Sequence, residues 1–407
     1  MCDMYKCEAE PAFNFSTAAQ EADRCLLCHD APCTKACPAG TNPAKFIRSV
    51  RFRNFKGAAE TVRENNALGS ICARVCPTEK YCEMACSRTG IDKPINIGGL
   101  QRFVTDYEEA MGMEILHAGE PNGKKVALVG AGPANLTCAT ELLKLGYAVE
   151  LFEEKAEAGG YLTYGIPEYR LPQEVVRTEI KRIEDLGAVF HLNTMVDDLK
   201  LQDLKKNFDA VVVANGFSAA KVLPMFIDNE FTETAVDFLA RVKVAEGNVE
   251  VPNNVIVIGG GDVAMDTATT LKKLGCKNVT DVIYEKSCEF VASKKELAGT
   301  REAGVTMIDG YVPESVDGNT VVFKHRELDN TLTLSADLII LAVGQVNRDS
   351  FGLELNKNEV AFEGYHVEGT NCFVAGDIAQ GDKTVVAAVK KGKEAACAVD
   401  EYLGSEN

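Results

Sequence analysis

The chain has 407 residues, 15 cysteines, 46% hydrophobic residues and a formal net charge of −17 at pH 7. This length predicts two or three domains of ordinary globular composition, and the negative charge argues against nucleic acid and anionic membranes, since either would repel it. No apolar run approaches the ~20 residues that cross a bilayer, and acids stand where a signal peptide would be basic, so we expect a cytoplasmic protein without a membrane segment.

The first predicted feature is a block of eight cysteines near the N-terminus. Its two runs read Cys25-x2-Cys28-x4-Cys33-x3-Cys37-Pro38 and Cys72-x3-Cys76-Pro77-x4-Cys82-x3-Cys86. Runs that contain Cys-Pro are typical of [4Fe-4S] sites, whose soft thiolate ligands offset the charge of the iron. Structural zinc is the alternative, because it also takes four cysteines. Spacing alone would make Cys72 the eighth ligand.

Between the two cysteine runs, the segment from Pro43 to Glu64 is predicted to be helical. Phe46, Ile47 and Val50 recur at helical spacing and are expected to face the core. The arginines and lysines of this segment are locally basic in an acidic protein. They would tune cluster potentials, receive a partner, or simply form a solvated face.

A first βαβ unit follows from Lys124 to Glu153 and is typical of dinucleotide binding. Gly130 allows a sharp turn, and Gly132 has no Cβ to hinder a pyrophosphate at the helix N-terminus. Glu153 ends the second strand, where it can accept hydrogen bonds from a ribose. Asn135 stands where the fingerprint has a small residue, so this turn alone is weak evidence.

A second βαβ unit starts at Asn254 and contains Gly259-x-Gly261-x-x-Ala264, the nicotinamide-type fingerprint. Two such units are much stronger evidence than one, because chance would have to produce the whole context twice. Glu285 ends the second strand, where an acid binds the 2′-hydroxyl of NADH and a basic residue would bind the 2′-phosphate of NADPH. We therefore expect NADH, although Lys286 beside it leaves use of NADPH open.

Near the C-terminus, the strand from Asn371 ends in Ala-Gly-Asp377, and a helix is predicted to begin at Thr384. This segment resembles the strand that returns to the first domain in two-dinucleotide flavoproteins, where the Asp binds the ribityl chain of the flavin. The resemblance implies that the first unit holds FAD. The Gly- and Pro-rich segment from Gly159 to Arg170 resembles a loop that covers the flavin, with an ordinary surface loop as the alternative.

Several longer motifs resemble the N-terminal part of dihydropyrimidine dehydrogenase. They are Cys-Leu-Leu-Cys-His-Asp-Ala-Pro-Cys, Phe-Ile-Arg-Ser-Val, Val-Cys-Pro-Thr and Pro94-Ile-Asn-Ile-Gly-Gly-Leu-Gln101. The whole layout from about Ala18 onward is similar to the separate NAD-oxidising subunit of the bacterial enzyme, and more distantly to the glutamate synthase small subunit. The resemblance implies an α/β protein with an N-terminal helical double [4Fe-4S] domain and two Rossmann-like domains, in which the NAD domain interrupts the FAD domain.

The resemblance also implies the site residues, and it leaves Cys72 free. One cluster would be held by Cys25, Cys28, Cys33 and Cys86, and the other by Cys37, Cys76, Cys82 and the side-chain amide of Gln101. The expected FAD contacts are Gly130, Ala131, Gly132, Pro133, Ala134, Glu153, Gly160, Leu162, Arg170, Val196, Gly376, Asp377, Thr384 and Val385. The expected NAD(H) contacts are Gly259, Gly260, Gly261, Asp262, Val263, Glu285, Lys286, Ala342, Val343 and Gly344.

These assignments divide the chain into a helical iron–sulfur domain (1–115), a first FAD part (116–225), an NAD(H) domain (226–345) and a second FAD part (346–407). NADH would reduce FAD, and two [4Fe-4S] clusters would pass electrons to a catalytic partner that carries FMN and iron–sulfur clusters. That partner, in a heterotetramer, would reduce uracil or thymine reversibly. No residue for pyrimidine chemistry is identified in this chain. The alternatives are electron supply to a glutamate synthase from NAD(P)H and a nucleotide-binding redox sensor.

Overall fold

The computed structural model describes residues 4–217, 219–356, 359–361 and 364–405, and the chain divides into two compact units. The larger unit contains Glu10–Leu162, Gln173–Gly216 and Asp349–Asn407. The insert unit contains Thr163–Pro172 and Phe217–Arg348, together with the N-terminal segment through Ala9. Each unit carries one of the two predicted glycine turns, and the cysteine block belongs to the larger unit.

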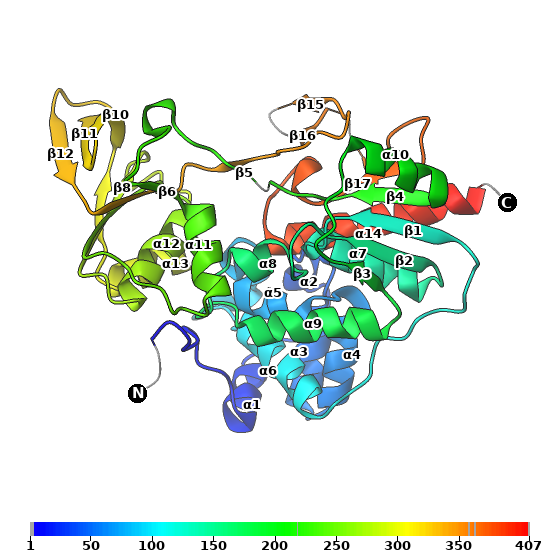
Figure 1. The fold of residues 1–407 in the computed structure, drawn as a ribbon. Coiled ribbons are helices and arrows are strands. Elements are labelled where there is room, and N and C mark those ends of the chain that lie inside the picture. Colours follow the sequence, from blue (N-terminus) through cyan, green and yellow to red (C-terminus); the bar gives the residue numbers. More distant parts are fainter. Residues whose placement is uncertain (1–3, 218, 357–358, 362–363, 406–407) are drawn as a thin grey trace. The chain divides into compact units, whose positions relative to one another are not determined.

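The N-terminal part of the larger unit is built of short helices, and the cysteines lie mostly in the loops between them (Figure 1). The elements are α1 (Phe15–Asp23), α2 (Pro32–Lys35), α3 (Pro43–Arg51), α4 (Phe55–Asn65), α5 (Gly69–Val75), the 3-10 helices η1 (Thr78–Lys80) and η2 (Ser87–Gly90), and α6 (Ile97–Ala110). Phe46, Ile47 and Val50 are buried in the core of this helical region, as their spacing predicted.

The expectation of one helix from Pro43 to Glu64 was wrong, because the segment forms α3 and α4. Arg53 adopts a positive φ of 59°, which ends the first helix. Asn54 then caps the second, and its Oδ1 accepts a hydrogen bond of 3.0 Å from the Gly57 amide. A side chain that caps a helix start competes with continued helix, which is the physical reason for the break.

The rest of the larger unit is a parallel sheet with the strand order β17-β4-β1-β2-β3. Its strands are β1 (Lys125–Val129), β2 (Ala148–Phe152), β3 (Val189–His191), β4 (Ala210–Val213) and β17 (Cys372–Val374). Its helices are α7 (Pro133–Lys144), α8 (Tyr161–Tyr164), α9 (Gln173–Asp185), α10 (Asp198–Asn207), η4 (Gly376–Ile378) and α14 (Val385–Ser405). The order reverses beside β1, which is where doubly wound sheets bind ligands.

The end of the chain completes this sheet. β17 pairs in parallel with β4, with Cys372 opposite Val211, and the long helix α14 packs on α7 (Figure 1). A Cβ on Gly392 of α14 would collide with the backbone oxygen of Ala134, so the two helices approach at this glycine as closely as backbones allow. The last part of the chain therefore forms one wall of the first glycine turn.

The insert unit contains a second parallel sheet with the order β6-β13-β7-β8-β9, beside a three-stranded antiparallel sheet β10-β11-β12. Its strands are β5 (Ala219–Ala220), β6 (Thr232–Thr234), β7 (Asn254–Ile258), β8 (Asn278–Ile283), β9 (Thr306–Asp309), β10 (Tyr311–Asp317), β11 (Thr320–His325), β12 (Thr331–Ser335), β13 (Leu338–Leu341) and β14 (Gln345–Val346). Its helices are η3 (Pro224–Phe226), α11 (Ala235–Val244), α12 (Asp262–Lys273) and α13 (Lys294–Glu302).

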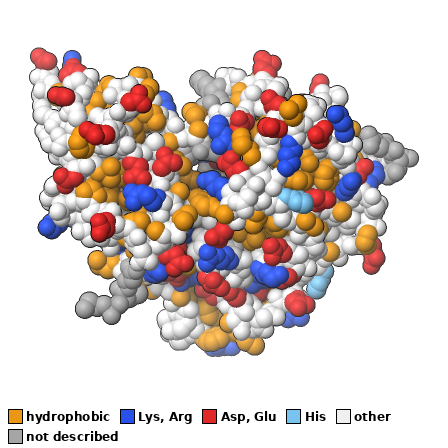
Figure 2. Space-filling model, viewed as in Figure 1, with side chains coloured by type: hydrophobic (Ala, Val, Ile, Leu, Met, Phe, Trp, Pro, Cys, Tyr) orange, Lys and Arg blue, Asp and Glu red, His pale blue; other side chains and the backbone are white. Residues whose placement is uncertain are grey.

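Two short antiparallel pairs complete the inventory, β5 with β14 and β15 (Leu355–Asn356) with β16 (Glu359–Val360). The structure confirms the expected α/β class: a helical region precedes two Rossmann-like sheets, and the second sheet is inserted in sequence before the first is complete. Acidic and basic side chains are interspersed on the face seen in Figure 2. Within the described part of the chain, no helix is both long and apolar enough to cross a membrane.

Candidate functional site

The first glycine turn joins β1 to α7 and has the geometry of a pyrophosphate cradle. Gly130 has a φ of 89°, and a Cβ there would lie 2.8 Å from the backbone oxygen of Ala214, so only glycine fits. Gly132 caps the start of α7, and a Cβ on it would meet nothing within 4 Å. The amides at this helix start therefore face an open space, in which the helix dipole favours an anion.

Glu153 closes the turn from the next strand. Its carboxylate accepts hydrogen bonds from the amides of Ala131, at 2.8 Å, and Lys155, at 3.0 Å. Burial raises the pKa of Glu153, and these two backbone donors oppose the rise. The structure thus brings together the glycine turn and the acid that the sequence predicted for a ribose.

Asn135 explains how the turn tolerates a departure from the fingerprint. Its Nδ2 donates hydrogen bonds of 2.8 Å to the backbone oxygens of Val129 and Gly130, and the side chain is fully buried. The amide therefore satisfies the carbonyls at the end of β1, where a small residue would only make room. Its Oδ1 is buried without a partner within the described residues. Asn135 is a site residue that fingerprint matching missed.

The glycine-rich loop after β2 lies on the first glycine turn. The amide of Gly159 donates to the backbone oxygen of Ala131 at 2.8 Å, and a Cβ on Gly160 would lie 3.1 Å from the Cα of Gly132. Leu162 and Val196 are both buried in the same unit. Gly160 therefore lies close against the first glycine turn, where a side chain would be crowded.

Arg170 lies in the insert unit, where its guanidinium is held by two acids. It donates to Asp266 of α12 at 2.6 Å and 2.7 Å and pairs with Glu296 of α13 at 3.1 Å. Burial raises the pKa of Asp266, and the guanidinium opposes that rise. Both acids that hold the guanidinium thus belong to the insert unit, and the expected contact of Arg170 with FAD stays a prediction.

The turn from Gly376 to Thr384, here called the C-terminal turn, lies between β17 and α14. Gly376 has a φ of 70°, and a Cβ there would lie 3.3 Å from the Cβ of Ala134 beside the first glycine turn. Asp377 follows, half-buried, and burial raises its pKa while Lys383 and Lys391 oppose the rise. The structure therefore brings the predicted Gly-Asp pair to the predicted phosphate turn.

Lys391 of α14 makes hydrogen bonds to the backbone of the C-terminal turn. It is 4% exposed, and its Nζ donates to the backbone oxygens of Gly376, at 3.1 Å, and Ala379, at 3.0 Å. Burial lowers the pKa of Lys391 to about 8, and Lys383 adds to the shift. Sequence reasoning missed Lys391; the signal was a lysine at an inward position of α14, one turn after the buried Ala388.

The second glycine turn repeats this arrangement in the insert unit. A Cβ on Gly259 would collide with the backbone oxygen of Ala342, whereas one on Gly261 would meet nothing within 4 Å. A Cβ on Gly260 would collide with the Glu285 carboxylate, so Glu285 lies directly over the turn. The structure therefore brings together the glycines and the acid expected to bind a ribose. Gly261 caps α12, which begins with Asp262 and Val263.

Lys286 turns toward a different acid. Its Nζ pairs with Glu327, on the loop between β11 and β12. The other basic group nearby, Arg326, pairs with Glu289 at 3.1 Å and lies over the ring of Tyr284. Both cations beside Glu285 are thus paired with other carboxylates. The predicted Val343 and Gly344 follow β13 directly after Ala342, so they lie at the same edge of the sheet.

The four cysteines expected to hold one cluster lie together. One small cavity in the helical region is lined by Cys25, Cys28, Cys33 and Cys86, with Ile47, Ile95 and Ile97 among the apolar residues around them. Burial raises the pKa of Cys33 to about 11, and the neighbouring Cys86 and Cys25 add to the shift. These thiols come from both cysteine runs, so the fold interleaves the runs as the family resemblance implied.

The remaining cysteines of the block form a second group. Burial raises the pKa of Cys76, and the nearby Cys72, Cys82 and Cys37 add to the rise. Burial also raises the pKa of Cys72 to about 12. Gln101 is buried on α6, and its Nε2 donates to the backbone oxygen of Gly69 on the neighbouring α5, at 2.8 Å. Both candidates for the eighth ligand, Cys72 and Gln101, are thus buried on helices that pack together.

The donor chemistry of both groups fits iron–sulfur clusters. Buried thiols with raised pKa values hold their protons until a positive centre replaces them, and thiolates are the ligands that iron clusters take. Among the residues that the structure describes, no three histidine, cysteine or carboxylate side chains converge as ligands of a single metal ion. The expected roles of these residues as cofactor ligands stay predictions.

A buried ion network joins the helical region to α9. The guanidinium of Arg63, fully buried on α4, pairs with Glu108 of α6 at 2.9 Å and with Glu179 of α9 at 2.7 Å. Arg182 also pairs with Glu108, and the Ser70 amide of α5 donates to Glu179. This network lies beside α5, which carries Cys72, and fixes the helical region against the sheet domain.

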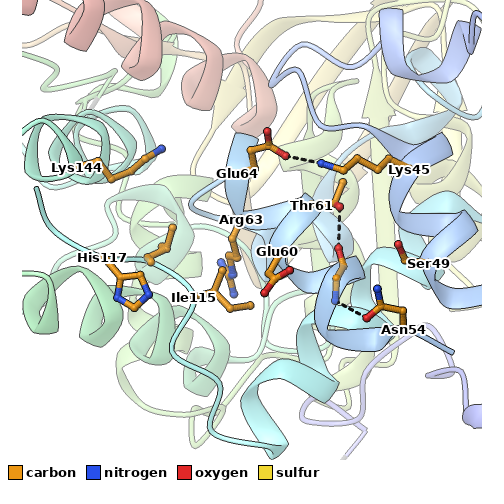
Figure 3. A pocket seen from close by; sticks show the side chains of 12 residues that line it. Lys45, Ser49, Asn54, Glu60, Thr61, Arg63, Glu64, Ile115, His117 and Lys144 are labelled. Carbon is orange, nitrogen blue, oxygen red and sulfur yellow. Dashed lines mark hydrogen bonds and ion pairs between the residues drawn. The ribbon is translucent and has the colours of Figure 1, made fainter.

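A hollow of about 690 Å³ has Arg63 among its lining residues (Figure 3). It lies between α3, α4 and residues 115–117, with Lys144 also lining it. Its charges are mixed, and Lys45 and Glu64 pair across it at 2.9 Å. None of the residues expected to bind a cofactor lines this hollow, so it is separate from the sites described above.

Two family models match the chain. Residues 4–113 match dihydropyrimidine dehydrogenase domain II, 4Fe-4S cluster, and residues 124–392 match pyridine nucleotide-disulphide oxidoreductase. The first match covers the whole cysteine block and confirms the expectation of iron–sulfur over zinc. The second covers both glycine turns and confirms the expected FAD and NAD domain.

Relatives match over nearly the full length. The chain is 54% identical over 402 residues to the NAD-dependent dihydropyrimidine dehydrogenase subunit PreT of Escherichia coli (strain K12), covering 98% of this chain and 97% of that protein. It is 51% identical to the PreT subunit of Salmonella typhimurium, with the same coverage of 98% and 97%. The NADP(+)-dependent formate dehydrogenase subunit beta of Moorella thermoacetica is 32% identical, over 92% of this chain and 60% of that protein.

Solved structures share the fold at low identity. Thioredoxin reductase of Lactococcus lactis matches with a TM-score of 0.56 and 19% identity, covering 69% of this chain and 99% of that one. A 2-naphthoyl-CoA reductase complex matches with a TM-score of 0.55 and 21% identity, covering 78% of this chain and 46% of that one. These likenesses establish the architecture of the two nucleotide-binding folds.

Proposed function

The chain belongs to the PreT family of NAD-dependent dihydropyrimidine dehydrogenase subunits, and from this premise we propose that it supplies electrons from NADH to a separate catalytic subunit. It is an oxidoreductase with a 4Fe-4S domain and an FAD/NAD domain. The proposed partner carries FMN and iron–sulfur clusters, reduces uracil or thymine to the 5,6-dihydro form reversibly, and joins this chain in a heterotetramer. We place the reaction in the cytoplasm, where cluster thiols stay reduced.

The proposal depends on one observation: hydrogen bonds connect the cysteine block to the first nucleotide-binding fold. Lys393 of α14 donates hydrogen bonds to the backbone oxygens of Ala39, at 2.9 Å, and Asn65, at 3.0 Å. Ala39 follows Cys37 by two residues, so the helix that completes the FAD fold is tied directly to a cluster-bearing loop.

Each binding role falls to residues at the ends of the parallel strands. The amides at the start of α7 would hold the pyrophosphate of FAD, Glu153 its ribose, and Asp377 its ribityl chain. In the insert unit, Glu285 would bind the adenosine ribose of NADH. Because a nicotinamide gives up two electrons together and a cluster accepts one, a bound flavin supplies the conversion between the two.

We assign the pyrimidine chemistry to the partner because each fold of this chain already has a proposed cofactor. The two Rossmann-like sheets take FAD and NADH, and the cysteine block takes the clusters. Reduction of a pyrimidine also needs a flavin and a proton donor against the flat ring of the substrate. These groups belong to the proposed partner.

The test compares NADH oxidation by the isolated chain with and without uracil. We expect steady NADH oxidation with an artificial dye and no acceleration by uracil. Adding the FMN-bearing partner should make NADH oxidation depend on uracil or thymine. A Cys76→Ser variant should abolish that dependence while largely sparing dye reduction. Dihydrouracil formed by the isolated chain would contradict the division of labour.

A further inference from the structure

The C-terminal turn makes a hydrogen-bonded contact with the loop between two proposed cluster ligands. That loop runs from Cys76 to Cys82, contains η1, and is here called the cluster loop. The hydroxyl of Tyr81 donates to the carboxylate of Asp382 and lies 3.2 Å from the Oγ1 of Thr384. Tyr81 immediately precedes Cys82, and Thr384 is one of the proposed FAD contacts.

The backbone of the cluster loop gives Tyr81 little freedom. Its amide donates to the oxygen of Thr78 at 3.1 Å, and its own oxygen accepts from the Ala85 amide at 3.1 Å. The cysteines on either side of η1 are both proposed ligands of the same cluster, so cluster binding would fix the loop at both ends. The position of the Tyr81 hydroxyl is then set by the cluster.

The C-terminal turn is likewise held in one conformation. Lys391 and Lys383 both donate to the backbone oxygen of Ala379, at 3.0 Å and 3.1 Å. Asp382 also accepts from the Lys383 amide at 2.8 Å. Tyr81 is therefore a point at which a turn of the flavin site contacts a loop of the cluster site, in addition to the link from Lys393 to Ala39.

We propose that Tyr81 is a positioning residue that couples the two cofactor sites of the larger unit. FAD binds more tightly when the cluster held by Cys37, Cys76, Cys82 and Gln101 is in place, and that cluster is retained longer when FAD is bound. The cluster fixes Tyr81, and Tyr81 holds Asp382 and the proposed FAD contact Thr384 in place. The inference rests on the proposed positions of FAD and of this cluster.

The coupling must act equally in both directions. If the cluster strengthens FAD binding by some factor, FAD strengthens retention of the cluster by the same factor. A hydrogen bond to a charged group sets the scale, so we expect a factor of about tenfold. Both directions can be measured without turnover.

The experiment measures FAD affinity by flavin fluorescence in protein with and without the cluster, prepared anaerobically. In the wild type, removal of iron or the Cys76→Ser change should weaken FAD binding about tenfold. In Tyr81→Phe, which keeps the ring and loses the hydroxyl, FAD affinity should be the same with and without the cluster. The reverse measurement is the rate of iron release to a chelator, which FAD should slow in the wild type and not in Tyr81→Phe.

Tyr147→Phe is the matched control. The Tyr147 hydroxyl donates to Asp400 at 2.7 Å on helix α14, which follows the C-terminal turn, and neither residue is assigned to a cofactor. This variant should keep the coupling of the wild type. Asp382→Ala removes the other side of the contact and should lose the coupling as Tyr81→Phe does, with no further loss in the double variant.

The inference is overturned if the cluster still strengthens FAD binding in Tyr81→Phe. It is also overturned if the FAD affinity of the wild type is the same with and without the cluster. Either result leaves the proposed function intact, provided that the protein binds FAD and iron. A purified wild type that takes up neither FAD nor iron overturns the proposed function together with the inference.

Discussion

At the scale of single residues, the carboxylate of Glu285 lies over Gly260, where the adenosine ribose of a dinucleotide would bind. A carboxylate there accepts hydrogen bonds from the free 2′-hydroxyl of NADH and repels the 2′-phosphate of NADPH. We predict that kcat/KM for NADH exceeds that for NADPH by at least ~10-fold, and that Glu285→Arg narrows or reverses the ratio. Steady-state dye reduction with each coenzyme measures this.

Two further variants give this prediction its controls. Glu314→Arg makes the same charge change at an exposed position of β10 and should leave the coenzyme ratio unaltered. Glu327→Gln releases Lys286 from its ion pair and should raise NADPH use modestly, since a freed cation can bind a phosphate. Equal use of both coenzymes by the wild type would show that Glu285 does not select NADH over NADPH.

Asp281 carries a second prediction, because it is a fully buried acid on strand β8, which lies between β7 and β9. Both of its carboxylate oxygens are without partners within the described residues. Burial raises the pKa of Asp281 well above its usual value, so the folded protein keeps a proton that the unfolded chain loses. The free energy of unfolding therefore falls as pH rises from about 4 toward the raised pKa.

Replacing this acid by an apolar residue should stabilise the insert unit. We predict that Asp281→Val raises the free energy of unfolding at neutral pH by about 1–3 kcal/mol and flattens its pH dependence. Urea unfolding between pH 4 and pH 8 would measure both effects. Asp317→Val, at an exposed position of β10, should change neither. A wild type whose stability rises over this range would contradict the assigned sign.

The site residues that could be predicted from the sequence are those that local backbone geometry dictates. A glycine turn needs Gly130 and Gly259 wherever the rest of the chain goes, and the acid at the end of the next strand follows from the βαβ unit itself. Asn135, Lys391 and Tyr81 could not be predicted in the same way. The partner atoms of Lys391 and Tyr81 belong to separate elements, so their roles exist only in the folded chain.

At the scale of elements, Arg63 joins α4 to α6 and α9. Its side chain has 0% exposure and pairs with two buried carboxylates. Removing the cation leaves Glu179 buried without this ion pair and Glu108 with only its pair to Arg182, so Arg63→Met should lower the free energy of unfolding by about 3–5 kcal/mol. Chemical denaturation followed by circular dichroism would measure the loss.

The control for Arg63 is another arginine in an ion pair with a glutamate. Arg177 of α9 pairs with Glu157 at 3.2 Å, but both side chains are about half exposed. Exposed pairs contribute about 0–1 kcal/mol, so Arg177→Met should have a small effect. Similar losses of unfolding free energy in the two variants would contradict the claim that burial makes the Arg63 network stabilising.

The helix α5 carries a prediction about cluster ligands, because it holds both Cys72 and Cys76. Cys72 lies inside the helix, whereas Cys76 caps its end, where the backbone turns extended with a ψ of 130°. The family resemblance assigns Cys76 as a ligand and leaves Cys72 free. We predict that Cys72→Ser keeps the full iron content and that Cys76→Ser loses about half of it, measured by iron analysis and EPR. Equal losses of iron in the two variants would favour Cys72 as a ligand, as the cysteine spacing alone suggests.

Most helices and strands could be predicted from the sequence, and the break between α3 and α4 is the exception. Strands and helices around the glycine turns follow from apolar runs and helical spacing, and they appear where the sequence placed them. The break at Arg53 and Asn54 was missed because Phe46, Ile47 and Val50 continue a helical pattern up to it. Only the capping hydrogen bond from Asn54 to Gly57 distinguishes two helices from one.

At the scale of the whole molecule, the cysteine block and the first nucleotide fold share one compact unit. We predict that the purified protein contains about eight irons and one FAD per chain, since eight proposed cluster ligands lie beside one flavin fold. Iron analysis, flavin release and broad absorption near 400 nm would test this. Stoichiometric zinc in place of iron would contradict it.

The division of the chain was harder to foresee than its folds. Two βαβ fingerprints predict two sheets, and the Gly-Asp strand predicts a return to the first of them. The contribution of residues 163–172 to the insert unit has no local signature. It depends on contacts such as that of Arg170 with Asp266, which join segments far apart in sequence.

The late arrival of β17 also determines the order in which a ribosome can finish this protein. The strand β13, which completes the inserted sheet, ends at Leu341, whereas the partner of β4 arrives only at Cys372 and the packing helix after it. During translation β4 therefore remains an open sheet edge, which is a hazard for pairing with other nascent chains. The insert unit can capture its coenzyme while synthesis continues, but FAD loading must wait for the last helix to emerge. A message truncated after β13 would yield a coenzyme-binding protein that never becomes yellow.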